Sequence, residues 1–109
     1  MLAYELSEIQ QQHADAGNLW LEFLRVPNLS MGLYVLPAGG SDPQQPHTED
    51  EVYYITGGQG RIRVGDEDRA VQMGSIVYVA AHVAHHFHSI EEPLQILVFF
   101  APAEGSVAA

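Results

Sequence analysis

The sequence predicts an all-β protein, an antiparallel sandwich or barrel, and two observations support this fold class. From Leu19 onward the chain consists of short runs rich in β-branched and aromatic residues, each about one strand long. Turn-forming residues separate these runs at close intervals, and no helical segments alternate with them as in α/β proteins. A chain of 109 residues is long enough for one hydrophobic core, so we expect one domain spanning residues 1–109.

The first element expected is a short N-terminal helix over residues 7–14. Ser7 followed by Gln10 resembles a capping box, in which the two side chains satisfy backbone groups at the start of a helix. Gly17 and Asn18 follow this segment and are expected to end the helix.

The strands are expected in the order LWLEFLRV, LSMGLYVL, EVYYIT, GRIRVGDE, RAVQM, SIVYVAA, HHFHSI and LQILVFF. The turns between them are predicted at residues 27–28, 37–46, 57–58, 65–68, 74 and 91–93. The barrel core is therefore expected over about residues 19–101, with a small, polar and frayed tail over residues 102–109.

Composition and charge exclude several classes of function. The formal net charge is −10, with four Arg and no Lys, so phosphate backbones and anionic membrane surfaces are expected to repel the chain. Nucleic acid and membrane are therefore not expected as partners. The absence of Cys and Lys excludes thiolate and Schiff-base chemistry. The N-terminus lacks the pattern of a signal peptide, which predicts a cytoplasmic protein.

His47, Glu51 and His85 are the candidate metal ligands that the sequence itself suggests. Pro46 and the run EVYYIT place His47 in a loop and Glu51 at the start of a strand, so their side chains can converge. Strand alternation places His85 and Phe87 on one face, and His86 and His88 on the other. The alternatives are a surface ion pair for His47 and Glu51, and a hydrogen-bonded buried imidazole for His85.

The spacing of two motifs resembles that of the cupin superfamily. The first motif of the family reads approximately G-x5-H-x-H-x3-E-x6-G, and this chain matches it from Gly39 through Gln45, His47 and Glu51 to Gly58. The one departure is Gln45, which stands where the family usually has the first His.

The second motif reads approximately G-x5-P-x-G-x2-H-x3-N, and it begins here at Gly74. Ala80 replaces the Pro, His82 replaces the second Gly, and Ser89 replaces the final Asn, whereas the ligand position is kept as His85. The resemblance covers about residues 30–101. It implies a small double-stranded β-helix, or jelly roll, as the fold.

By resemblance, one divalent metal ion is held by His47, Glu51 and His85, helped by Gln45. Gln45 either completes the ligand set or holds a bound water beside a face with open positions. Two imidazoles, one carboxylate and an oxygen do not distinguish among Fe, Mn, Ni, Zn and Co.

Tyr53 and His82 are the candidate catalytic residues. Tyr53 is predicted to share the face of Glu51, and His82 lies in the turn before His85, although both are also consistent with packing or a polar loop position.

The resemblance implies a metal-dependent enzyme that acts on a small molecule, and the reaction expected first is a dioxygenase-like oxidation. The alternatives are an isomerase or lyase, and a non-catalytic module that binds or senses a sugar-like or keto acid-like ligand with the same metal. It also implies a homodimer in which N-terminal strands around Trp20 and Phe23 join the sheet of a second subunit.

Overall fold

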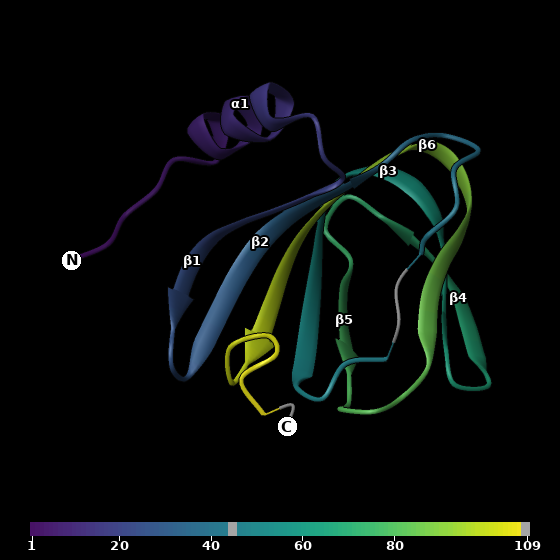
Figure 1. Cartoon of the computed structure of the whole chain (residues 1–109). Helices are drawn as coiled ribbons and strands as arrows, with labels where there is room; N and C mark the ends of the chain where they lie inside the picture. The colour runs from purple at the N-terminus through teal and green to yellow at the C-terminus, as the bar shows by residue number, and fades with distance from the viewer. Residues whose placement is uncertain (44–45, 108–109) are drawn as a thin grey trace.

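The fold was obtained as a computed structural model that describes residues 1–43 and 46–107 (Figure 1). One helix is followed by strands that pair only in antiparallel ladders in the described residues. The elements are α1 (Leu6–Ala16), β1 (Trp20–Val26), β2 (Leu29–Leu36), β3 (Asp50–Val64), β4 (Glu67–Gln72), β5 (Ile76–Val79) and β6 (His85–Ala101). The predicted all-β class with a short N-terminal helix is confirmed.

Helix α1 is slightly longer than predicted and starts differently. Its N-cap is Glu5, which makes no side-chain capping hydrogen bond, so the capping box expected at Ser7 is not formed. Gly17 ends the helix as expected, and its N–H donates to the carbonyl of His13. Ile9 is the buried residue of the helix. No helix in the described part of the chain has the length and apolar character needed to cross a membrane.

Strands β3 and β6 are each twice as long as predicted, because two expected turns are bends inside continuous strands. The segments 57–58 and 91–93 lie opposite one another in the β3–β6 ladder, where Gly57 pairs with Gln95 and Gln59 pairs with Glu92. The register shifts at this point, which is typical of β-bulges that bend a sheet. The prediction of turns at these two places was wrong.

Gly58 shows why the bend requires glycine. Its φ is +88°, and a Cβ built there would lie 2.0 Å from the carbonyl oxygen of Pro93. The backbones of β3 and β6 therefore approach one another too closely at the bend for any side chain at this position.

The bends let β3 and β6 take part in both halves of the fold. Residues 51–54 of β3 lie between β5 and the C-terminal half of β6, whereas residues 59–64 lie between β4 and the N-terminal half of β6. Strand β2 extends the sheet from β6, and β1 lies at its end. The sheet curves around the core without closing, since β1 and β4 are not neighbours in the described strand order (Figure 1).

The core lies on the concave side of this curved sheet. Alternate residues of β3 and β6 face it, including Tyr53, Ile55, Ile62, Phe87, Leu94 and Ile96, each at most 1% exposed. The predicted alternation is confirmed, since Glu51, Tyr53 and Ile55 are buried together, as are His85 and Phe87.

The segment after β6 is docked, not frayed, up to Ser106. Ala103 is buried and its N–H donates to the carbonyl of Pro27. The N–H of Glu104 donates to the hydroxyl of Ser30, which is fully buried in β2. The prediction of a frayed tail was wrong for residues 103–105, because their backbone N–H groups find acceptors at Pro27, Ser30 and Glu49.

Candidate metal centre

The structure brings three predicted ligands together at one end of β3. Glu51 is the second residue of β3, His85 is the first residue of β6, and His47 lies in the loop that leads into β3. One ligand atom from each of these three residues lies within 4.8 Å of the others. Glu51 and His85 are buried, and His47 is partly buried. This cluster is the candidate metal centre.

Three ligand atoms in the cluster are buried without a hydrogen-bond partner. They are Nδ1 of His47, Oε2 of Glu51 and Nε2 of His85. Nδ1 of His47 lies 2.7 Å from Oε1 of Glu51, and Nε2 of His85 lies 3.3 Å from the same oxygen, yet neither contact has hydrogen-bond geometry. Buried polar atoms are almost always satisfied, so unsatisfied nitrogen and oxygen atoms that converge fit a bound cation.

A backbone contact fixes the tautomer of His85. Its Nδ1 lies 2.9 Å from the carbonyl oxygen of Val83. Because a carbonyl can only accept, the proton must sit on Nδ1, which leaves the lone pair on Nε2 available to a metal.

Glu104, which the sequence analysis did not identify, lies against the other edge of His47. Its Oε2 is 3.1 Å from Nε2 of His47. A carboxylate that accepts from one ring nitrogen of a ligand His leaves the other nitrogen for the metal. No spacing or motif in the sequence links Glu104 to His47, since a docked segment brings them together.

The carboxylates around His47 favour positive charge at this position. The carboxylates of Glu104 and Glu51 beside the ring raise the pKa of His47 to about 10, although burial opposes the shift. A site that favours a proton in this way has the charge balance to accept a divalent cation in its place.

The remaining predicted site residues have different positions. Gln45 lies outside the described residues. Tyr53 is completely buried, with its ring 5.0 Å from that of Phe87 and 5.9 Å from that of His85.

His82 is exposed and has a φ of +69°, a backbone conformation typical of the glycine it replaces in the motif. The N–H of His82 donates to the carbonyl of His47, so the turn before β6 is tied to the loop that carries a ligand.

A cavity of about 260 Å³ opens beside His47. Its lining comprises Leu19, Trp20, Tyr34, Pro43, His47, Val98, Phe100 and Glu104. Neither Tyr53 nor His82 lines this cavity, so their catalytic roles stay predictions.

Comparisons with known proteins agree with this fold. The sequence profile described as the cupin domain matches residues 32–100. The chain is 48% identical over 105 residues to an uncharacterized protein of Streptomyces coelicolor, an alignment that covers 96% of this chain and 100% of the relative.

Solved structures of low sequence identity share the fold. The TT1209 protein of Thermus thermophilus matches with a TM-score of 0.76 and 22% identity, over 94% of this chain and 99% of its own. An RmlC-like cupin with a double-stranded β-helix fold from Methanocaldococcus jannaschii matches with a TM-score of 0.69 and 22% identity, over 76% and 78% of the two chains. At this level of identity the structures establish the architecture alone.

Proposed function

This chain belongs to the cupin domain family, and from that premise we propose that it is a metal-dependent enzyme that oxidises a small organic molecule by dioxygenase-type chemistry. Family membership alone gives no reaction, because one fold supports many activities. The proposal therefore depends on the chemistry of the residues around the cluster.

One observation carries the proposal, namely the convergence of three buried ligand atoms that lack hydrogen-bond partners. His47, Glu51 and His85 would hold one divalent ion, and Gln45 would assist them as the sequence motif predicts. Two imidazoles and one carboxylate with open positions are typical of Fe(II) oxygenases, although Mn, Ni, Zn and Co suit the same donors. When bound, the ion would supply Lewis-acid or redox chemistry at its open positions.

The chain's own residues would bind and orient the substrate. The cavity beside His47 has aromatic and aliphatic walls against which a small molecule would pack. Glu104 lines this cavity and would be the carboxylate that accepts a proton from a substrate hydroxyl.

The second candidate function is binding or sensing of a small molecule without turnover. The position of Tyr53 favours it, because this candidate catalytic residue is completely buried in the core and does not line the cavity. The supply of titratable groups beside a bound ligand is then small, as expected for a binding module.

The experiment that tests the proposal measures metal and oxygen in the same preparations. Protein purified without chelator is analysed by mass spectrometry for its metal content. The Fe(II)-loaded form is then assayed for oxygen consumption with a panel of catechols, keto acids and flavonoids. We expect about one ion per chain and substrate-dependent oxygen uptake.

His47→Ala and His85→Ala should each lower metal affinity more than about 100-fold, since each removes a ligand. His86→Ala is the matched control, because His86 is exposed on the opposite face of β6. Absence of stoichiometric metal, or equal metal in all three variants, would contradict the proposed centre. Stoichiometric metal without oxygen uptake would favour the binding function.

A further inference from the structure

The cavity beside His47 has walls suited to an aromatic ring. Trp20 packs edge-on against Tyr34 and Phe100, with ring centroids 6.2 and 6.1 Å apart. Leu19 and Val98 complete the apolar lining. An apolar cavity of about 150 Å³ holds benzene, so a cavity of about 260 Å³ accommodates one substituted ring.

Most polar groups at the cavity are already engaged. The hydroxyl of Tyr34 donates to Oδ1 of Asp42 over 2.7 Å, and Oδ2 of the same carboxylate accepts from the N–H of Phe87 over 2.8 Å. Burial, with the help of Asp42, holds the pKa of Tyr34 well above its usual value, so this hydroxyl stays neutral. A sugar would bury several hydroxyls against these walls without partners, which is unfavourable.

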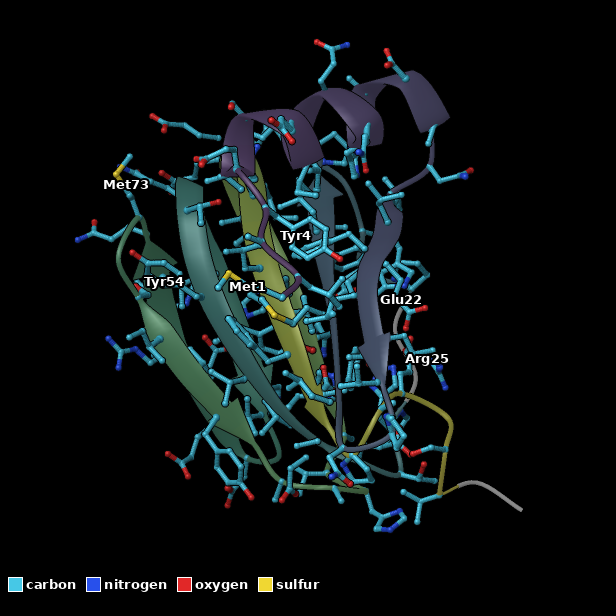
Figure 2. The ribbon with its side chains drawn as sticks, turned by 90° about the vertical axis from the view of Figure 1, so that its left-hand side faces the viewer. Met1, Tyr4, Glu22, Arg25, Tyr54 and Met73 are labelled. Carbon is cyan, nitrogen blue, oxygen red and sulfur yellow. The ribbon has the colours of Figure 1, made fainter. Side chains whose placement is uncertain are left out.

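Glu104 is the group that sets the charge of the cavity. In residues 1–43 and 46–107 no Arg lines the cavity, and His47 and Glu104 are the titratable groups beside the aromatic walls that can carry charge at neutral pH. Arg25 reaches the carbonyl of Glu104, but its guanidinium is paired with Glu22 at 2.9 Å on the edge strand (Figure 2). The chain therefore offers an incoming anion no unpaired cation at the described walls.

The charges of Glu51 and Glu104 together balance that of a divalent ion. With Glu51 alone, a bound ion would leave one net positive charge, which attracts carboxylate ligands. Glu104 adds a second negative charge on the cavity side of His47, so the loaded site is formally neutral.

We propose that Glu104 makes the cavity selective for an uncharged, hydroxyl-bearing aromatic molecule over an aromatic carboxylate. This inference rests on the proposed function in that it takes the ion as bound. The hydroxyl of the ligand donates to Glu104, and the ring packs against the wall that Trp20 and Phe100 form together. Keto acids and sugars are excluded as ligands by charge and by the apolar walls respectively.

The test uses zinc-loaded protein, because zinc is diamagnetic, and three probes: benzyl alcohol, benzoate and xylose. Trp20 is the single Trp of the chain and lines the cavity, so its indole N–H resonance reports occupancy by NMR. We expect benzyl alcohol to bind at least about tenfold more tightly than benzoate, and xylose to cause no shift.

Glu104→Gln removes the charge but keeps a side-chain oxygen that can accept from His47. The segment should stay docked, because the backbone N–H and carbonyl of Glu104 make the contacts with Ser30 and Arg25. In this variant the preference for benzyl alcohol should disappear or reverse. Glu91→Gln is the matched control, because it changes the net charge equally at an exposed residue of the bend.

Three results would overturn the proposal: equal affinities for benzyl alcohol and benzoate in the wild type, an unchanged ratio in Glu104→Gln, or no shift with any probe. The zinc content of every sample is also measured. It distinguishes failure of this proposal about Glu104 from failure of the proposed metal-dependent function. A protein without zinc that still prefers benzyl alcohol contradicts the metal centre and supports the role of Glu104.

Discussion

His47 connects three segments that lie far apart in the sequence. Its ring lies 2.7 Å from Glu51 in β3 and 3.1 Å from Glu104 beyond β6, and its carbonyl accepts from His82 before β6. Its ring centroid is also 4.8 Å from that of Phe100. The position of this candidate ligand therefore depends on the correct docking of the C-terminal segment.

Glu49 should make the docking of that segment depend on pH. Burial alone would raise the pKa of Glu49, but hydrogen bonds from Thr48, Gly105 and Val107 hold it below its usual value. A lowered pKa in the folded state stabilises the fold above the ordinary carboxyl pKa, and this contribution is lost as the pH falls through the folded value.

Glu49→Gln should therefore cost about 1.5–3 kcal/mol at pH 7 and less near pH 4, because the lost hydrogen bonds involve a charged acceptor. The measurement is urea unfolding followed by Trp20 fluorescence, with EDTA present so that metal binding does not contribute. Glu91→Gln serves as the exposed control. A cost that is equal at both pH values would contradict this role for Glu49.

At this scale the sequence predicted which three residues form the cluster but not what surrounds them. The spacing of His47, Glu51 and His85 was informative because motif positions and strand alternation place those side chains on one face. Glu104 carried no such signal, since its role depends on a long-range contact between two loops. Asp42, which joins Tyr34 to β6, was missed for the same reason.

At the scale of elements, the positions of the strands were predicted better than their ends. Segments expected as separate strands proved to be halves of β3 and of β6. Glycine and proline are equally typical of a turn and of a bulge, so local sequence cannot decide whether the chain reverses or bends. The decision comes from the facing strand, which is distant in the sequence.

Gly58 at the bend and Gly74 in the turn between β4 and β5 form a matched pair of substitution sites. Gly74 has a φ of +93° and no atom near the position of a Cβ, so Gly74→Ala should cost about 1–2 kcal/mol from backbone strain alone. Gly58 has nearly the same φ, but its Cβ would also clash with the backbone of Pro93. Gly58→Ala should therefore be clearly more destabilising in urea unfolding, or prevent folding. If both variants lost the same free energy of unfolding, the backbones of β3 and β6 would move apart at the bend at little cost, which would contradict this prediction.

At the scale of the whole molecule, β1 is the end of the sheet and stays the predicted site of dimerisation. The N–H of Val35 donates to the carbonyl of Leu19, so by alternation the N–H groups of Trp20 and Glu22 face the open edge. The segment before α1, with Met1 and Tyr4, lies across the outer face of the sheet (Figure 2). The edge is therefore the part of β1 best placed to pair with a second subunit.

Light scattering should give a mass twice the 12.0 kDa of one chain. Glu22→Pro removes an outward N–H without breaking the ladder to β2 and should yield monomers. Glu22→Ala keeps that N–H and should remain dimeric. A monomeric wild type, or dimers in both variants, would contradict pairing through this edge.

The sharing of β3 and β6 between both halves of the sheet has a consequence for hydrogen exchange. Neither half can open without disrupting strands that the other half needs, so amides throughout β3 and β6 should exchange only through global unfolding. An ion bound by Glu51 and His85 stabilises only the folded state and should slow that global step. When the ion is added, the amides of Gly60 and Ile62 should become better protected from hydrogen exchange, although they lie on the far side of the bend from Glu51. The amides of α1 should continue to exchange by local opening.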